Sequence, residues 1–174
     1  MQIQITVDLS AEPVTYQEAK DYLKLSNDYE QDLIEELITS ARERLEKFTG
    51  LSFGDKTIKC YTRQSNKWFE LPYQPLVAIT SVLDDDGVAL TYESRGLQYK
   101  QIYTSSNNGI NVIYTVGWGA SGLPKGLKQA ILKQVSTDYW NRENYLIGDS
   151  ANELSSSAKM TAQSYSRNTL LGIL

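Results

Sequence analysis

The 174-residue sequence has a net charge of −4, and 41% of its residues are hydrophobic, which is enough for one folded domain with a core. A general nucleic-acid binder is expected to be basic, because neutralising phosphates supplies most of its affinity, so this balance argues against tight DNA or RNA binding. The chain has no histidine and one cysteine, Cys60, which excludes histidine-dependent catalysis, an intrachain disulfide and a cysteine-rich zinc site.

Targeting signals are not apparent in the sequence. The first residues lack the basic start and apolar run of a signal peptide. No stretch approaches the roughly 20 apolar residues of a membrane span. We therefore expect no membrane insertion, and the single cysteine indicates synthesis in a reducing cytosol.

The N-terminal part predicts an extended segment and a short helix. Residues Gln2–Leu9 alternate between polar and apolar side chains, which is typical of a short strand or an extended arm. Thr15 and Glu18 stand at the spacing of a capping box, which predicts a helix that begins there and continues to about Leu25.

Residues Asp28–Gly50 predict a long amphipathic helix, the longest stretch with one consistent period. Leu33 and Leu37 widen an apolar stripe formed by Ile34, Ile38, Ala41, Leu45 and Phe48. Asp28 is placed to cap the N-terminus, and Gly50 is placed to end the helix in the left-handed conformation. The stripe needs a cover from elsewhere in the chain.

After Gly50 the period changes from 3.6 to 2, which predicts an antiparallel β meander. The strand-like runs are Thr57–Arg63, Trp68–Leu71, Leu76–Leu83, Val88–Tyr92, Leu97–Tyr103 and Gly109–Val116. The sequence Asp84-Asp85-Asp86-Gly87 is a strong turn signal within this region.

The helical period returns after Pro124 and continues to about Glu143. Its apolar stripe, which is expected to cover the long helix, consists of Leu127, Ala130, Ile131, Val135 and Tyr139. The fold class is therefore α+β, with a helical core (about 15–50 and 124–143) and a β insertion (about 56–118). We expect one domain over residues 1–148, followed by a flexible C-terminal tail over residues 149–174.

Two short motifs suggest ligand sites, but each has a simpler interpretation. Gly117–Gly122 matches G-x-G-x-x-G, yet a dinucleotide site also needs a parallel strand after the following helix, and none is predicted. Asp84, Asp86, Gly87 and Glu93 fit part of a calcium-loop pattern whose first position is the apolar Val82, so a hairpin turn is favoured. No catalytic, cofactor-binding or metal-binding residue is predicted.

Three stretches occur in an order that resembles a known family. They are a short "EAK.YL" helix with "LI..LI..AR..LE..TG" (Thr15–Gly50), an "LP..PL..I.SV" run into an acidic turn (Glu70–Gly87), and "P..LKQAIL" ending in "Y.NRE" (Gly117–Glu143). The chain resembles the head–tail connector, or adaptor, proteins of tailed phages, some of which are described as DNA-packaging proteins. The resemblance covers most of residues 15–143, and the sequence after Tyr145 departs from it.

The resemblance implies a structural protein of the virion neck and no enzyme. Copies of the chain would form a ring, commonly of twelve, beneath the portal protein and would join the capsid to the next neck or tail protein. Phage DNA would pass through the ring without sequence-specific binding. The protein would be made in the cytoplasm of the host bacterium, and it would need no cofactor and no membrane.

Two groups of residues are candidates for contacts with other proteins. The candidate subunit interface consists of Arg42, Glu43, Arg44, Glu46, Lys47, Tyr139, Trp140 and Arg142. A solvated charged face, with ordinary packing of the aromatic residues, is the alternative. The candidate partner-docking tail consists of Leu170, Leu171, Ile173 and Leu174. Its alternative is that these residues pack back on the chain's own helices.

Two other functions remain open from the sequence alone. One is a DNA-packaging accessory protein similar to a small terminase subunit, although the acidic charge disfavours it. The other is a small nucleotide-binding domain that uses Gly117–Gly122.

Overall fold

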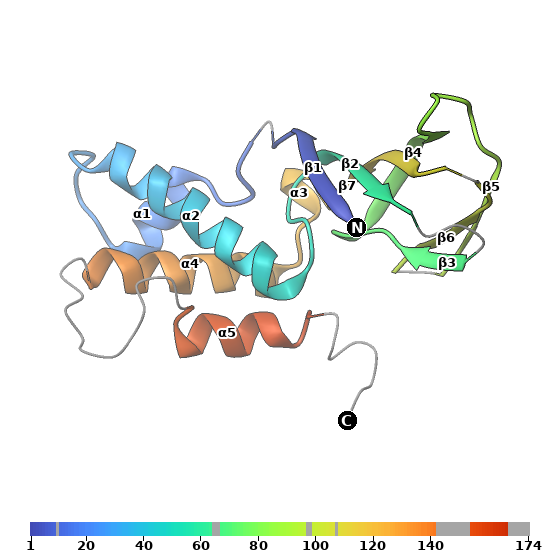
Figure 1. The fold of residues 1–174 in the computed structure, drawn as a ribbon. Helices are drawn as coiled ribbons and strands as arrows, with labels where there is room; N and C mark the ends of the chain where they lie inside the picture. The colour runs from blue at the N-terminus through green and yellow to red at the C-terminus, as the bar shows by residue number, and fades with distance from the viewer. Residues whose placement is uncertain (10, 64–66, 97–98, 107, 142–153, 167–174) are drawn as a thin grey trace. The chain divides into compact units, whose positions relative to one another are not determined.

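The chain forms two units, each built from two separated stretches of sequence. The β unit contains residues 1–11 and 51–119, and the helical unit contains residues 12–50 and 120–174. The computed structural model describes residues 1–9, 11–63, 67–96, 99–106, 108–141 and 154–166 (Figure 1). The α+β class predicted from the sequence is confirmed, with most strands between the long helix and the helices that follow.

Within the described residues, the helices are α1 (Tyr16–Leu23), α2 (Gln31–Thr49), α3 (Gly119–Gly122), α4 (Lys125–Trp140) and α5 (Ser156–Gln163). The predicted capping box starts α1. The backbone N–H of Thr15 donates to Glu18 Oε2 at 2.9 Å, and that of Glu18 donates to Thr15 Oγ1 at 3.2 Å. Gly50 ends α2 with a φ of 71°, as its sequence position indicates.

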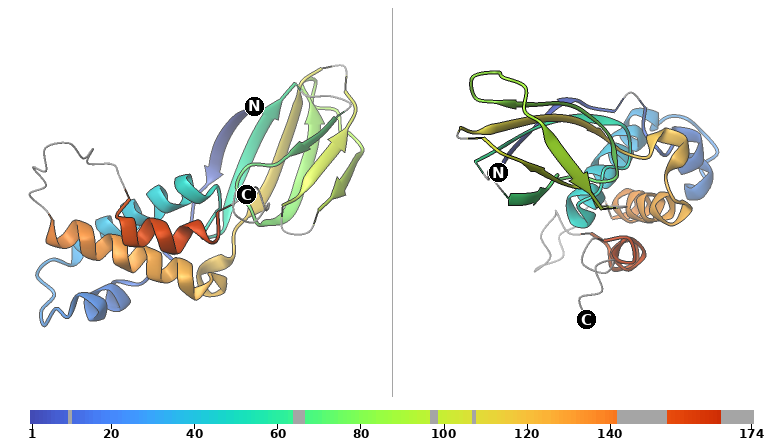
Figure 2. Two further views of the ribbon diagram at one scale, coloured as in Figure 1. Left: turned by 90° about the horizontal axis from the view of Figure 1, so that it is seen from below. Right: turned by 90° about the vertical axis from the view of Figure 1, so that its right-hand side faces the viewer.

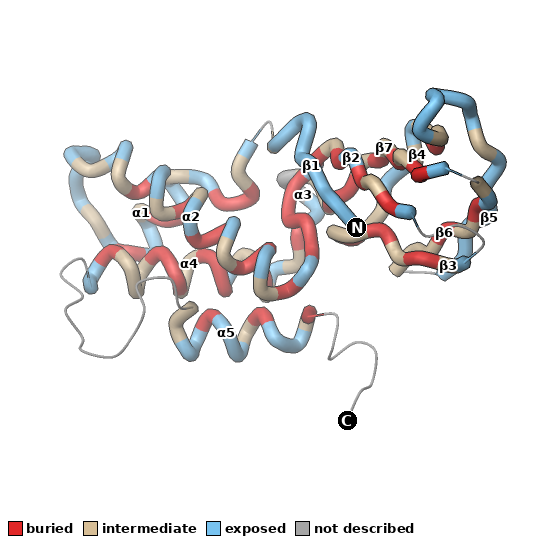
Figure 3. The backbone as a smooth tube through the Cα atoms, viewed as in Figure 1, coloured by how far each residue is buried: buried red, intermediate tan, exposed pale blue. Residues whose placement is uncertain are grey.

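The apolar stripes of α2 and α4 pack against each other, as predicted. The buried members on α2 include Ile34, Ile38, Ala41 and Leu45. On α4 all five predicted residues, Leu127, Ala130, Ile131, Val135 and Tyr139, are buried. Figures 1 and 3 show these two helices side by side, with their buried positions facing the interior of the helical unit.

Two details of the helical unit differ from the sequence analysis. Asp28 does not cap α2, whose N-cap residue is Glu30 and has no side-chain capping bond. The Asp28 carboxylate instead accepts hydrogen bonds from the Tyr16 hydroxyl and from Lys20 Nζ, at 2.7 and 2.5 Å. The second difference is α5, a helix in a region where no element was expected, which packs on α4 through the fully buried Ala158 and Ala162.

The β unit contains two antiparallel sheets (Figure 2). The four-stranded sheet has the order β1 (Gln2–Val7), β2 (Lys56–Thr62), β7 (Ile110–Val116) and β4 (Leu76–Asp84). The three-stranded sheet has the order β3 (Lys67–Glu70), β6 (Gln101–Thr104) and β5 (Tyr92–Arg95). Their facing sides enclose one core, to which both sheets contribute and in which Tyr114 is fully buried.

The strands do not follow one another as the predicted meander does. β2 pairs with β7, which lies far along the chain, because both strands present an alternating apolar face to the same core. The predicted strand Val88–Tyr92 is reduced to an isolated bridge between Leu83 and Ala89, after which the chain joins the second sheet as β5. The repeat of period 2 reveals strands but does not specify their partners.

β1 lies at one edge of the four-stranded sheet and is exposed along its whole length. Ile3 pairs with Cys60, and Ile5 pairs with Ile58, so the two isoleucines share a face with fully buried residues. They are nevertheless 44% and 41% exposed. The apolar face of the sheet therefore continues to an edge that the three-stranded sheet does not cover.

Candidate assembly surfaces

The motifs that suggested ligand sites have structural roles in the β unit. β7, which precedes Gly117, is antiparallel to both of its neighbours, so the parallel arrangement of a dinucleotide fold is missing from this strand. A Cβ on Gly117 would lie 2.1 Å from the carbonyl oxygen of Gly54, and its φ is 122°. Close backbone packing therefore explains the glycine at this position.

The acidic turn is held together by hydrogen bonds to backbone and side-chain groups. Asp84 Oδ1 accepts from the backbone N–H groups of Asp86 and Val88, at 3.0 and 2.8 Å. Asp85 Oδ2 accepts from the N–H of Gly109 at 3.0 Å. The bond between Asp84 and Asp86 is that of an Asx turn, and the bond of Asp85 ties the turn to the segment before β7. Among the described residues, no group of three or more His, Cys, Asp or Glu side chains is placed to hold a metal ion.

Cys60 is fully buried in the core between the sheets. Burial raises the pKa of its thiol to about 11, because the thiolate would lose its hydration. The thiol therefore stays protonated near neutral pH and acts as a small apolar side chain.

Two of the predicted interface residues, Arg42 and Glu46, are buried inside the helical unit. Arg42 Nε donates to Glu12 Oε2 at 2.8 Å, and Arg42 Nη1 donates to Glu46 Oε2 at 2.8 Å. Desolvation by itself lowers the pKa of Arg42, but the two carboxylates outweigh it and raise the pKa overall. This triad (Glu12, Arg42 and Glu46) ties the segment before α1 to the middle of α2.

Three further members of the predicted interface lie closer to solvent. Glu43 and Lys47 are exposed on α2. Arg44 is half-buried and forms an ion pair with Asp138 of α4. Glu43 also lies 3.6 Å from Arg42 Nη2, measured at its Oε1, which is a long ion pair at the surface. A contact with another subunit is open to the exposed Glu43 and Lys47, whereas Arg44 already joins two helices.

The aromatic members of the predicted interface divide in the same way. Tyr139 is buried, and its hydroxyl donates to the carboxylate of Glu30. Trp140 is 65% exposed and meets the Tyr139 ring edge-on. Arg142 and the predicted docking tail, Leu170, Leu171, Ile173 and Leu174, lie outside the described residues. The assignment of these residues to interfaces stays a prediction.

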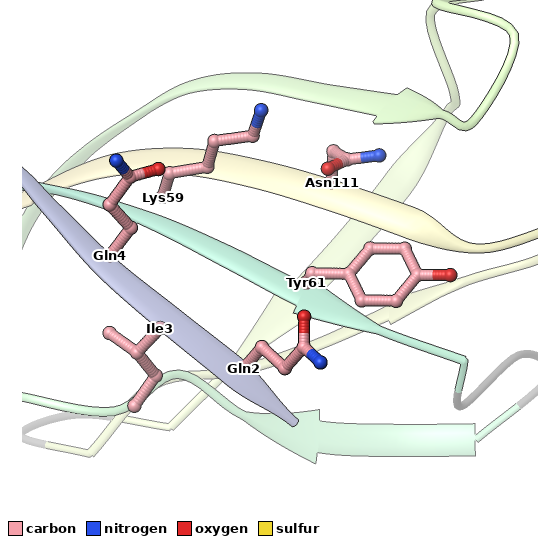
Figure 4. A pocket seen from close by; sticks show the side chains of 6 residues that line it. All are labelled: Gln2, Ile3, Gln4, Lys59, Tyr61 and Asn111. Carbon is pink, nitrogen blue, oxygen red and sulfur yellow. The ribbon is translucent and has the colours of Figure 1, made fainter.

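The outer face of the four-stranded sheet, which no sequence motif indicated, presents mostly polar side chains, one of them charged, around a shallow hollow. Its lining comes from three adjacent strands, namely Gln2, Ile3 and Gln4 of β1, Lys59 and Tyr61 of β2, and Asn111 of β7. In Figure 4, Gln2 and Gln4 lie on the opposite side of β1 from Ile3. The alternation of β1 was visible in the sequence, but its exposure on both faces follows from its place at the edge.

A membrane-spanning helix is not found among the described residues, since none combines sufficient length with sufficient apolarity.

Comparison with known proteins identifies a family and a fold. The family model described as "Head completion protein" matches residues 12–167. A search of curated proteins gives no match. A chain from the neck of an empty gene transfer agent (GTA) particle, computed with C6 symmetry, aligns over 95% of both chains with a TM-score of 0.78 and 16% identity.

Two other solved structures show the same fold. Chains from the virion of the native GTA particle and from its neck computed with C12 symmetry each align with a TM-score of 0.72. Each alignment covers 95% of both chains, with identities of 17% and 16% respectively. The similarity therefore extends over both units of the chain.

Proposed function

Because the chain belongs to the head completion protein family, we propose that it is a structural ring subunit in the neck of a phage-like particle. The ring lies beneath the portal, extends the DNA channel and joins the capsid to the next neck or tail protein. The observation that carries this proposal is the family match over residues 12–167. The fold shared with GTA neck chains from maps of C6 and C12 symmetry supports it.

The proposed partners are further copies of this chain, the portal protein and the next neck or tail protein. A ring of twelve copies is consistent with the C12 symmetry used for one of the similar neck structures. DNA passes through the ring without sequence-specific binding. The net charge of −4 supports this role, since an acidic surface repels phosphates and does not retain the moving duplex. No catalytic step and no cofactor are part of the proposal.

In the helical unit, exposed side chains make the proposed contacts with neighbouring proteins. Glu43, Lys47 and Trp140 are the described candidates whose side chains face solvent. Trp140 resembles the residues that dominate many interfaces, because it combines a large apolar area with a polar N–H group. The buried triad acts indirectly by fixing the shape of α2.

Native mass spectrometry and electron-microscopic class averages of the full-length chain, alone and mixed with its portal protein, test the proposal. We expect a closed ring of about twelve copies, formed either alone or on the portal, as symmetric oligomers close through repeated identical contacts. A chain that stays monomeric in both settings contradicts the proposal. Duplex DNA binding that weakens steeply with salt would instead favour a packaging accessory protein.

A further inference from the structure

The two edges of the four-stranded sheet run in opposite directions. β1 is antiparallel to β2, β2 to β7, and β7 to β4. Three successive reversals leave β1 and β4 pointing in opposite directions along the sheet. If a second copy is set beside the first in the same sense, its β1 therefore meets β4 in antiparallel orientation.

Both edges offer an open segment of similar length. All six residues of β1 are exposed. On β4, the end of the strand is covered by the returning chain, since the N–H of Leu90 donates to the carbonyl of Val82 and the N–H of Asp84 donates to that of Val88. The part of β4 before Val82, residues 76–81, has no strand on its outer side among the described residues.

Neither open segment carries a charged residue or a proline, which are two of the usual protections of a sheet edge. Proteins commonly guard exposed edges with charged residues or proline, which discourage the pairing of strands between molecules. Gln2–Val7 reads QIQITV and residues 76–81 read LVAITS, without a charge or a proline in either. Val77 is 62% exposed, and Val7 is 59% exposed. Both edges are therefore chemically suited to accept a further strand.

We propose that β1 of one copy pairs with the open segment of β4 in the next copy, so that the four-stranded sheets join around the ring. The inference rests on the proposed ring function and names the surface that builds the ring. The contact uses two different edges of one subunit, and such a head-to-tail contact propagates into a closed ring when its rotation closes. Backbone hydrogen bonds between the edges hold the subunits together.

Side-chain chemistry favours a second copy as the occupant. Ile3 and Ile5 continue the core face of the sheet to one edge, and Leu76 and Ile79 belong to the same face at the other. The joined sheet thus places apolar residues next to apolar residues and covers the isoleucines that one subunit leaves exposed. Register shifts within β4, on either side of Ile79, bend this edge and disfavour pairing with arbitrary strands.

Three lysine variants of the full-length chain test the pairing under conditions in which the wild type forms rings. Ile5→Lys and Val77→Lys each place a charge in one of the joined edges, and we expect the concentration for half-assembly to rise about tenfold or more. Val88→Lys is the matched control, because Val88 is 59% exposed in the same unit but lies outside both open segments. Its assembly should equal that of the wild type. Melting temperatures establish that each variant folds. If Ile5→Lys does not fold, the assembly of Val77→Lys decides the test.

The double variant Ile5→Lys/Val77→Glu provides the rescue. In head-to-tail pairing, every junction of this variant joins an edge that carries a lysine to an edge that carries a glutamate, and the attraction between opposite charges should let assembly recover relative to the single lysine variants. Sensitivity of assembly to Ile5→Lys but not to Val77→Lys indicates β1-to-β1 pairing and overturns the proposal. Rings that form equally well in all variants also overturn it, while leaving the ring function intact. A wild-type chain that forms no ring, alone or with the portal, overturns both.

Discussion

Arg42 is a charged residue that the fold buries in an ion-pair cluster and does not expose to solvent. It is 2% exposed in the middle of α2, where its guanidinium meets the carboxylates of Glu12 and Glu46. A buried ion pair stabilises a fold only modestly overall, but the loss of one partner leaves charge without compensation in a poorly hydrated site. The triad therefore fixes the geometry of the helical unit more than it adds to its stability.

Replacing Arg42 by alanine is expected to lower the free energy of unfolding by about 3–5 kcal/mol, because the Glu12 and Glu46 carboxylates then face each other without the guanidinium. Glu36→Ala, on the exposed side of α2, should change it by no more than about 0.5 kcal/mol. Urea denaturation of both variants measures the difference. Equal losses would show that the triad has no special structural role.

The capping box of α1 gives a pH-dependent contribution to stability. The hydrogen bond from the Thr15 backbone, which outweighs the effect of burial, together with Lys128, lowers the pKa of Glu18 below its ordinary value of 4.5. A carboxyl group whose folded-state pKa is lowered stabilises the fold above its unfolded pKa. That contribution is lost as the pH falls through the lowered, folded-state value.

Glu18→Gln should therefore melt at a lower temperature than the wild type at pH 7. The difference in melting temperature should narrow as the pH falls below about 4, where the wild-type carboxyl also becomes protonated. Thermal melts over this pH range give the measurement. Glu36→Gln, on the exposed face of α2, controls at pH 7 for the loss of one negative charge. A gap that is constant with pH would count against the ionised capping box.

Gly117 is a position where both the backbone conformation and the space around it require glycine. Its φ of 122° is rare for other residues, and the carbonyl of Gly54, a backbone group, blocks a side chain. Gly117→Ala should lower the free energy of unfolding by about 3 kcal/mol or more. Gly50→Ala is the comparison, because Gly50 has a positive φ but open space around it, so the cost should be about 1 kcal/mol. Similar losses in thermal unfolding would mean that the close packing is unimportant.

At the scale of elements, α5 depends on small residues at its contact with α4. Ala158 and Ala162 are fully buried, the N–H of Ser155 donates to Gln134 Oε1 at 2.8 Å, and Lys133 Nζ donates to Thr161 Oγ1 at 2.8 Å. Each small side chain allows close approach but buries little apolar area, so hydrogen bonds at both ends of α5 contribute to this contact alongside packing.

Ala162→Glu is expected to release α5, because a longer charged side chain cannot fit in the contact with α4. Hydrogen exchange should show lost protection over residues 156–163, while the amides of α2 and α4 remain protected. Gln163→Glu introduces the same side chain at the exposed neighbouring position and should leave α5 protected. Loss of protection throughout the helical unit would show that α5 is integral to its core.

The sequence predicted those elements that depend on local pattern. The capping box at Thr15 and the apolar stripes of α2 and α4 are visible because their determinants lie within a few residues of each other. α5 was missed because its buried positions are alanines, which give almost no contrast with the polar residues around them. The residue type and position of Asp28 predict a helix cap. Its bonds to Tyr16 and Lys20 depend instead on the fold of the intervening loop, which leaves no local signal in the sequence.

The order of the strands could not be predicted in this way. Pairing between β2 and β7 depends on the closure of a long loop and on the shared core, and neither leaves a local signature. The same limit applies to the candidate interfaces. The helical period placed Arg42 and Glu46 on the charged side of α2, but the segment around Glu12 covers that side and takes them out of solvent.

At the scale of the whole molecule, we expect the C-terminal apolar residues to contribute to assembly. Leu170, Leu171, Ile173 and Leu174 follow a polar stretch, which is an unusual place for apolar surface unless a partner covers it. Deletion of residues 168–174 should leave the melting temperature of the monomer unchanged and weaken assembly onto the portal. Differential scanning calorimetry and co-sedimentation with the portal test the two parts. A lowered melting temperature would mean that these residues pack on the chain itself, and unchanged assembly would contradict docking.

The division of each unit into two stretches also determines the order in which the chain can fold during synthesis. β1 is synthesised before the other described strands but must wait for β2, and the sheet lacks one of its two central strands until β7 has emerged. The apolar stripe of α2 lacks its main cover throughout the synthesis of residues 51–119, because α4 comes afterwards and only α1 precedes it. Ribosome-bound chains should therefore gain protease resistance in two steps, first in the β unit and then in the helical unit. During this interval α2 presents the kind of surface that general chaperones bind.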